Sequence, residues 1–217
     1  MSTVVAIDGP AGAGKSTVAR RVAERLNYAY INTGSLYRAL AYAATAAGVP
    51  FSEIGQDFLD SCKLEFRGAD LYCNGKLLTS ELRAPECAKG ASVISANSLV
   101  RDYQMPVQRN SADGQWIVME GRDIGTVVLP DAGLKIFMTA NDESRARRRY
   151  KELLEKGENV TFEDVYQNMV KRDDKDKNRK IAPAVPADDA VLFDNTEYGL
   201  NESIDYVVEL AKKRFSV

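Results

Sequence analysis

The segment Gly9–Ser16 (GPAGAGKS) fits the pattern GxxxxGK(S/T), and its neighbours give the pattern a structural context. Val4–Ile7, directly before it, is a short β-branched run without alternation, which is typical of a buried central strand. Lys15–Leu26, directly after it, places its apolar residues on one helical stripe. Glycines let successive backbone N–H groups turn around phosphate oxygens, and the helix N-terminus adds roughly half a positive charge. The sequence therefore predicts a phosphate-binding loop between a strand and a helix.

Strands alternate with helices along most of the remaining chain, which predicts a parallel sheet with helices on both faces. Further strands are predicted over Tyr28–Ile31, Trp116–Met119, Leu134–Met138 and Val191–Phe193. Helices are predicted over about 35–47, about 142–156, from Thr161 into Lys171–Arg179, and over the closing segment that carries Ile204, Val207, Val208 and Ala211.

The stretch between residues 62 and 109 has a different character. Two β-prone runs in Cys62–Thr79, with the hairpin signal Asn74-Gly75, predict a small antiparallel meander inserted in the main domain. Pro85–Arg109 is predicted to be mainly helical, with Ser98 as an N-cap. Pro106 is expected to end or kink the second helix of this stretch.

Composition excludes several classes of protein. The 217 residues are 45% hydrophobic and 28% charged, as in a globular protein, and a net charge of −2 argues against general binding to nucleic acid or membrane. The absence of histidine removes Ser-His and Cys-His hydrolases and His-ligated zinc sites. Cys62, Cys73 and Cys87 form no CxxC pair, so we expect reduced core thiols and a cytoplasmic protein. No apolar run approaches the ~18 residues of a membrane span.

Several charged residues lie where strands end or helices begin. In a phosphate-binding loop, Lys15 would bridge the β- and γ-phosphates and Ser16 would coordinate Mg²⁺. Glu120 follows a strand, where an acid often serves the hydrated Mg²⁺, and Arg122 could clamp a phosphate. Arg122 and Arg38 could equally be surface charges, and the clusters at 144–149 and 172–179 could be solvated helix faces. Fixed guanidinium groups on a hinged segment are what phosphoryl transfer would use.

The loop alone leaves GTPases, ATPase motors and small-molecule kinases open. The chain has no NKxD sequence for reading guanine and is short for a motor. A kinase of another small acceptor, such as shikimate, and a nucleotide-binding regulatory module remain the alternatives to a nucleotide kinase.

Several motifs over nearly the whole chain resemble the bacterial cytidylate kinases, members of the nucleoside monophosphate kinase group. The motifs are IDGPAGAGKST (7–17), TGSLYR (33–38), EGRDIGTVV (120–128), Pro130-Asp131-Ala132 and RDDKDKNR (172–179) followed by Ala182-Pro183. The resemblance implies an α/β P-loop NTPase fold with a five-stranded parallel core, a helical lid and a monophosphate-binding insert with a small antiparallel sheet. Thr33 stands where a Ser is common, and Ser16 where many members have Gly.

The resemblance also implies the function and its residues. The expected activity transfers the γ-phosphoryl group of ATP, with Mg²⁺, to CMP or dCMP. ATP would be held by Gly9, Pro10, Ala11, Gly12, Ala13, Gly14, Lys15, Ser16 and Thr17. CMP would be held by Thr33, Arg38, Ser92, Arg101, Arg122, Asp123, Arg172, Asp176 and Arg179, with Ser92, Arg101 and Asp123 reading cytosine and Asp176 contacting the sugar. Lys15, Arg122, Arg172 and Arg179 would be catalytic, and Ser16 and Glu120 would serve the metal.

These expectations give one domain with three subregions. The core would comprise residues of about 1–35, 110–145 and 185–217, the monophosphate-binding region about 36–109, and the lid about 150–180. We expect a cytoplasmic monomer whose partners are small nucleotides, without nucleic acid or membrane.

Overall fold

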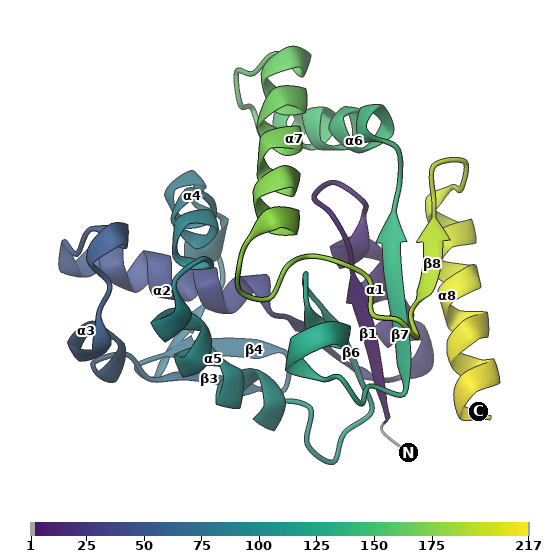
Figure 1. Cartoon of the computed structure of the whole chain (residues 1–217), viewed down its shortest axis with the longest axis horizontal. Helices are drawn as coiled ribbons and strands as arrows, with labels where there is room; N and C mark the ends of the chain where they lie inside the picture. Colours follow the sequence, from purple (N-terminus) through teal and green to yellow (C-terminus); the bar gives the residue numbers. More distant parts are fainter. Residues whose placement is uncertain (1–2, 217) are drawn as a thin grey trace. The chain divides into compact units, whose positions relative to one another are not determined.

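The computed structural model describes residues 3–216. Five strands form the central sheet: β1 (Val4–Asp8), β2 (Ala29–Asn32), β6 (Ile117–Glu120), β7 (Leu134–Thr139) and β8 (Val191–Asp194). Their order is β2-β6-β1-β7-β8, and the pairs β1–β6, β1–β7 and β7–β8 are parallel. Figure 1 shows β1, β7 and β8 running in the same direction. The predicted parallel sheet is confirmed, and the predicted strand ends agree with the observed ones within one residue.

The helices of the structure are α1 (Lys15–Leu26), α2 (Gly34–Ala47), α3 (Gln56–Asp60), α4 (Pro85–Ile94), α5 (Ser98–Asn110), α6 (Asp142–Glu155), α7 (Phe162–Asn178) and α8 (Leu200–Phe215). Short helical turns occupy η1 (Phe51–Glu53), η2 (Glu81–Arg83) and η3 (Ile124–Val128), the last of which is π-helical. Helix α1 packs against β1, β6 and α8 through its apolar stripe. Every residue of β1 is buried, as the uninterrupted apolar pattern predicts for a strand with two parallel neighbours.

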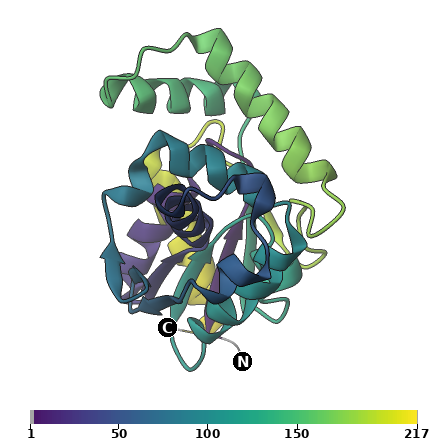
Figure 2. The same ribbon diagram turned by 90° about the vertical axis from the view of Figure 1, so that its left-hand side faces the viewer.

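The chain divides into two compact units. The first contains the residues up to Tyr28 and from Trp116 onward, and the second is Ala29–Gln115. Within the first unit, α6 and α7 pack against one another (Figure 2). Thr161 starts α7 as predicted, because its hydroxyl accepts the backbone N–H of Asp164 at 3.1 Å.

The second unit has its own apolar core, built from α2, α4 and the small sheet. That sheet contains β3 (Leu64–Arg67), β4 (Asp70–Cys73) and β5 (Lys76–Leu78), paired antiparallel in this order. Asn74 and Gly75 form the turn between β4 and β5, with φ angles of 51° and 79°. Both angles lie in the left-handed region that a two-residue hairpin requires, so the predicted meander is confirmed.

Two details of α5 differ from expectation. Pro106 does not end the helix, which continues to Asn110. The carbonyl that Pro106 leaves without its helical partner belongs to the exposed Asp102, where water can hydrate it. The N-cap is Asn97 rather than Ser98, because the Asn97 amide oxygen accepts the backbone N–H of Leu99 at 2.9 Å.

Two expectations on composition can be compared with the structure. Cys62, Cys73 and Cys87 are free and buried, as predicted. Among residues 3–216, no helix has the length and apolar character that crossing a membrane would require.

Candidate active site

The carboxyl ends of four parallel strands of the first unit meet at one edge of the sheet. The register pairs Ile7 at the end of β1 with Glu120 of β6, and Thr139 of β7 with Asp194 of β8. The residues that follow these strands are therefore neighbours in space. Ligands of open α/β sheets bind at this edge, so the loops that leave it define the candidate site.

The predicted phosphate-binding loop leaves β1 at this edge and enters α1. Gly9, Gly12 and Gly14 have φ angles of 143°, 72° and 87°, which side chains with a Cβ rarely adopt. At Gly9 the space is also closed, because a Cβ there would lie 2.0 Å from the carbonyl oxygen of Met138. The loop thus has the conformation and position that the sequence pattern predicts.

Lys15 begins α1 with only 6% of its surface exposed. Its Nζ donates a hydrogen bond to the carbonyl of Pro10 at 2.7 Å, inside the same loop. Burial, and next the positive charge of Arg122, lower the pKa of Lys15 well below its usual value. Because the Glu120, Asp8 and Asp173 carboxylates raise that pKa, charges of both signs surround this ammonium group. Anionic phosphates would favour its protonated form.

Asp8 is a buried acid that the sequence analysis did not single out. Its two carboxylate oxygens accept the backbone N–H groups of Ile124 at 2.9 Å and Gly125 at 2.8 Å, which ties the end of β1 to the first turn of η3. Burial raises the pKa of Asp8 to about 6, against the lowering effect of these two hydrogen bonds. Its position between an apolar strand and the first glycine of the loop was a signal in the sequence that could have indicated this role.

The structure brings together five predicted site residues of the first unit. Asp176 lies on α7 and pairs with Arg122 at 3.2 Å and with Arg172 at 3.9 Å. Asp123 pairs with Arg179 at 3.2 Å, and both side chains of this pair are 9% exposed. Two segments far apart in the sequence, 120–123 and 172–179, therefore form one cluster of alternating charges. The backbone N–H of Gly121 donates to the carbonyl of Ile7 at 3.1 Å, so the segment 120–123 lies beside the start of the phosphate-binding loop.

Predicted site residues of the second unit occupy α2, α4 and α5. Thr33 is the buried N-cap of α2, and Arg38 lies one turn into that helix. Arg101 is buried, and its guanidinium donates to the Tyr37 hydroxyl at 3.1 Å and to the Ser95 carbonyl at 3.4 Å.

Ser92 lies in the last turn of α4, and Ser95 directly follows that helix. Because Arg101 contacts the Ser95 carbonyl, Arg101 lies close to the end of α4 that carries Ser92. Tyr37 was part of the motif TGSLYR but was given no role by the sequence analysis. Its hydroxyl contact with Arg101 shows why a tyrosine stands next to Arg38.

Further residues that hold the phosphate-binding loop were missed. The Asn195 side chain, after β8, donates to the carbonyl of Ala13 at 3.0 Å. Arg148 of α6 in turn donates to the side-chain and backbone oxygens of Asn195, each at 2.9 Å. Arg145 and Asp173 contact Ala11 on the other side of the loop. The cluster at 144–149 is thus only partly a solvated helix face, because Arg147 is exposed but Arg145 is buried.

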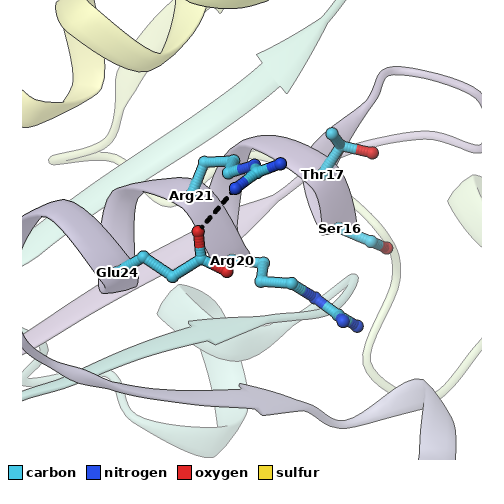
Figure 3. Close-up of a pocket in the computed structure, with 5 residues that line it drawn as sticks. All are labelled: Ser16, Thr17, Arg20, Arg21 and Glu24. Carbon is cyan, nitrogen blue, oxygen red and sulfur yellow. Dashed lines mark hydrogen bonds and ion pairs between the residues drawn. The ribbon is translucent and has the colours of Figure 1, made fainter.

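A pocket of about 380 Å³ lies along one face of α1, from Ser16 to Glu24. Figure 3 shows its five lining residues, Ser16, Thr17, Arg20, Arg21 and Glu24. The Arg21–Glu24 ion pair at 2.9 Å is exposed and adds little stability. The pocket is open beside the hydroxyl groups of Ser16 and Thr17, at the end of the loop.

The residues predicted to serve Mg²⁺ suit that ion. Ser16 presents an exposed hydroxyl at the start of α1, and Glu120 is a buried carboxylate whose charge acts on Lys15. Mg²⁺ prefers oxygen ligands and usually takes only one or two protein groups, with waters and substrate phosphates as the rest. Within residues 3–216 no group of three or more His, Cys, Asp or Glu residues is arranged to hold a metal by itself.

A phosphate-binding loop at the carboxyl edge of a parallel sheet, with a lysine and a cluster of arginines beside it, defines a P-loop protein of the kinase type. Solved structures agree on the fold. A protein from Eubacterium ventriosum aligns with a TM-score of 0.57 over 97% of this chain and 99% of its own, at 14% identity. The shikimate kinase from Bacteroides thetaiotaomicron aligns with a TM-score of 0.50 over 96% and 98% of the two chains, at 11% identity.

Sequence comparison gives the family. The family model described as "Cytidylate kinase" matches residues 5–213. A cytidylate kinase from Thermosipho africanus is 43% identical over 97% of this chain and 95% of its own, and one from Thermotoga neapolitana is 42% identical over 99% of both. The chain therefore belongs to the cytidylate kinase family, and the predicted resemblance is confirmed.

Proposed function

We propose that the protein transfers the γ-phosphoryl group of ATP to CMP or dCMP, giving ADP and CDP or dCDP, and that it does so at the carboxyl edge of the sheet. Membership of the cytidylate kinase family supports CMP as the acceptor. The single structural observation that carries the proposal is the position of Arg122, which follows Gly121 beside the start of the loop while its guanidinium pairs with Asp176 of α7 at 3.2 Å.

On the donor side, we assign the polyphosphate of ATP to Gly9–Thr17. Positive φ angles at its glycines turn the backbone of the loop, as a ring of N–H donors requires. Lys15 would exchange its hydrogen bond with the Pro10 carbonyl for the β- and γ-phosphate oxygens. Mg²⁺, when bound, would neutralise charge on these phosphates, and Ser16 and Glu120 would hold it directly or through water.

On the acceptor side, three arginines are paired with two carboxylates in the structure, which leaves a net positive charge for an anionic substrate. Arg122 and Arg172 share Asp176, and Arg179 pairs with Asp123. We propose that Arg122, Arg172 and Arg179 neutralise the transferring group, while Asp123 and Asp176 orient them and contact the base and the sugar. Thr33, Arg38, Ser92 and Arg101 complete the proposed CMP-binding set.

The chemistry needs no strong general base. A phosphate acceptor is already ionised near neutral pH, so its oxygen can attack without losing a proton to the protein. The absence of histidine from the sequence is therefore compatible with catalysis. Alignment of the two nucleotides and neutralisation of charge by Lys15 and the arginines would supply most of the rate enhancement.

We also propose that the protein acts as a monomer in the cytoplasm, in pyrimidine nucleotide metabolism. Three free, buried thiols support a reducing compartment.

The test is a coupled assay of ADP formation with CMP, dCMP, UMP and AMP as acceptors. We expect turnover with CMP and dCMP and much slower turnover with UMP and AMP. Preference for UMP or AMP, or no turnover with any acceptor, would contradict the proposal. Calorimetric titration with CMP alone distinguishes a kinase from a regulatory nucleotide switch, which should not bind CMP.

A further inference from the structure

The backbone of Ala11, in the middle of the phosphate-binding loop, is held on both sides by one ion pair. Its N–H donates to the Asp173 carboxylate at 2.9 Å, and its carbonyl accepts from the Arg145 guanidinium at 2.7 Å. Arg145 and Asp173 also pair directly with each other. Since Arg145 lies on α6 and Asp173 on α7, both helices are joined to the loop at a single residue, through the two peptide groups that flank it.

Arg145 is buried, and its guanidinium is already bonded within the protein. Its side chain is 5% exposed, and its other nitrogen atoms donate to the Ala140 carbonyl at 3.0 Å and to Asp142 at 2.6 Å. All three nitrogen atoms of the guanidinium thus have acceptors within the protein. Such a group fixes the position of other atoms rather than binding a ligand itself.

The next residue of the loop shows that the two helices approach it closely. A Cβ at Gly12 would lie 2.8 Å from the backbone oxygen of Arg145 and 3.0 Å from Sδ of the buried Met169. The loop is therefore in packing contact with α6 and α7 as well as hydrogen-bonded to them. A change at the Arg145–Asp173 pair should alter the conformation of the loop, because the pair and the loop are in direct packing contact.

We propose that Arg145 and Asp173 are positioning residues for nucleotide binding: their ion pair clamps the backbone of Ala11 on both sides and so holds the phosphate-binding loop in the shape that receives ATP. Neither is a catalytic residue, and neither contacts the reacting atoms. Lys15 and the remaining N–H groups of the loop bind phosphate, and the clamp keeps those groups in place.

The charge balance of the clamp gives the proposal a specific consequence. A carboxylate beside an anion-binding loop would by itself repel ATP, and Arg145 compensates it. Without Arg145, the negative charge of Asp173 remains beside the loop and repels ATP. Without the charge of Asp173, the positive charge of Arg145 remains, and it does not repel ATP. Loss of Arg145 should therefore weaken ATP binding more than loss of the Asp173 charge.

The experiment is calorimetric titration with ATP, without CMP, on the full chain and four variants. Asp173→Asn should raise the Kd for ATP roughly tenfold, since one charge-assisted contact is lost. Arg145→Met should raise it roughly a hundredfold, and the double variant Arg145→Met with Asp173→Asn should bind ATP better than Arg145→Met alone. Glu163→Gln makes the same charge change at an exposed position of α7 and should leave the Kd unchanged.

A purely structural role would give a different pattern. The variants would then lower the unfolding temperature of the nucleotide-free protein. The double variant would not bind ATP better than Arg145→Met alone. The proposal is overturned if Asp173→Asn binds ATP as tightly as the wild type, or more tightly, since the carboxylate would then compete with phosphate for the Ala11 N–H. If Arg145→Met does not fold, the Kd values of Asp173→Asn and Glu163→Gln for ATP still test the proposal.

The inference rests on the proposed function only for the identity of ATP. A wild-type protein that binds ATP but forms no CDP would contradict the proposed function and leave the clamp intact. A wild-type protein that forms CDP, with Asp173→Asn unchanged in ATP affinity, would overturn the clamp alone.

Discussion

Lys15 is the cation that belongs to the phosphate-binding loop itself, and it is buried with its Nζ on the Pro10 carbonyl. We expect Lys15→Ala to lower kcat by about 10³-fold or more, because one fixed charge on the transferring phosphates is lost. The fold should survive, since burial of an ammonium group costs free energy in the nucleotide-free protein. The coupled assay, together with thermal unfolding, measures both effects. A folded Lys15→Ala protein with nearly wild-type activity would refute the role of the loop.

Asp8 makes stability depend on pH in a direction opposite to that of most carboxylates. Burial raises its pKa in the native protein from the usual 3.8 to about 6, so the native state holds a proton that the unfolded state has lost. The stability associated with this proton is complete below about pH 4 and is lost as the pH rises through about 6. The two-unit difference corresponds to about 3 kcal/mol.

We therefore expect the free energy of unfolding of the wild type, relative to that of Asp8→Asn, to fall by about 3 kcal/mol between about pH 4 and about pH 7. Urea unfolding of both proteins across this range measures the difference. If the two pH profiles run parallel, Asp8 does not titrate in this range and its raised pKa is wrong.

At the scale of the elements, the turn from β1 into the phosphate-binding loop depends on Gly9. Gly9→Ala would place a methyl group 2.0 Å from the Met138 carbonyl oxygen, and backbone of the neighbouring strand cannot move aside cheaply. We expect a loss of about 3 kcal/mol or more in the free energy of unfolding.

Gly157→Ala is the matched control for this variant. Gly157 also has a positive φ, of 77°, but no atom lies within 4 Å of its added Cβ. Its substitution should cost only about 1 kcal/mol, from the backbone conformation alone. Urea unfolding that gives equal costs for the two variants would show that the contact with Met138 is not what requires glycine at position 9.

The start of α5 gives a second prediction. Asn97 accepts the Leu99 N–H and also donates to the Ile54 carbonyl at 3.0 Å, whereas Ser98 is exposed. Asn97→Ala should lower the free energy of unfolding by about 1 kcal/mol or more, and Ser98→Ala by less than about 0.5 kcal/mol. The reverse order in chemical denaturation would mean that the cap is the one predicted from the sequence.

Helices, strands and turns with a strong sequence pattern could be predicted from the sequence. Which of two neighbouring residues caps a helix could not be predicted. The apolar runs of β1 and β7 and the turn at Asn74-Gly75 each have one favourable conformation, so their prediction was correct. Ser98 and Asn97 are both good N-caps, and the contact of Asn97 with Ile54 distinguishes them only in the folded chain. Pro106 was expected to end or kink its helix; the helix does not end there, and the exposure of Asp102 that permits this is not visible in the sequence.

At the scale of the whole molecule, site residues within a local sequence motif could be predicted, and site residues brought together only by the fold could not. The loop residues share a local motif, so Gly9–Thr17 could be identified at once. Asp173 lies 162 residues from Ala11, and Asn195 lies 182 residues from Ala13. These contacts arise because parallel strands bring the segments after them to one edge, and nothing in the local sequence of Asp173 or Asn195 indicates which loop they meet.

The chain folds as two compact units, and the residues proposed for CMP are described in each unit separately. The first unit carries Arg122, Asp123, Arg172, Asp176 and Arg179, and the second carries Thr33, Arg38, Ser92 and Arg101. The proposed reaction requires that both nucleotides are bound when the phosphoryl group moves, because water would otherwise compete with CMP as the acceptor.

The most direct test follows the transferred group itself. The protein is incubated with CMP and ATP that carries a radioactive γ-phosphoryl group, and the labelled products are separated. We predict that the label appears in CDP and that little is released as inorganic phosphate. Label that appears only as inorganic phosphate, with CMP unchanged, would contradict the assignment of this chain as a kinase of CMP.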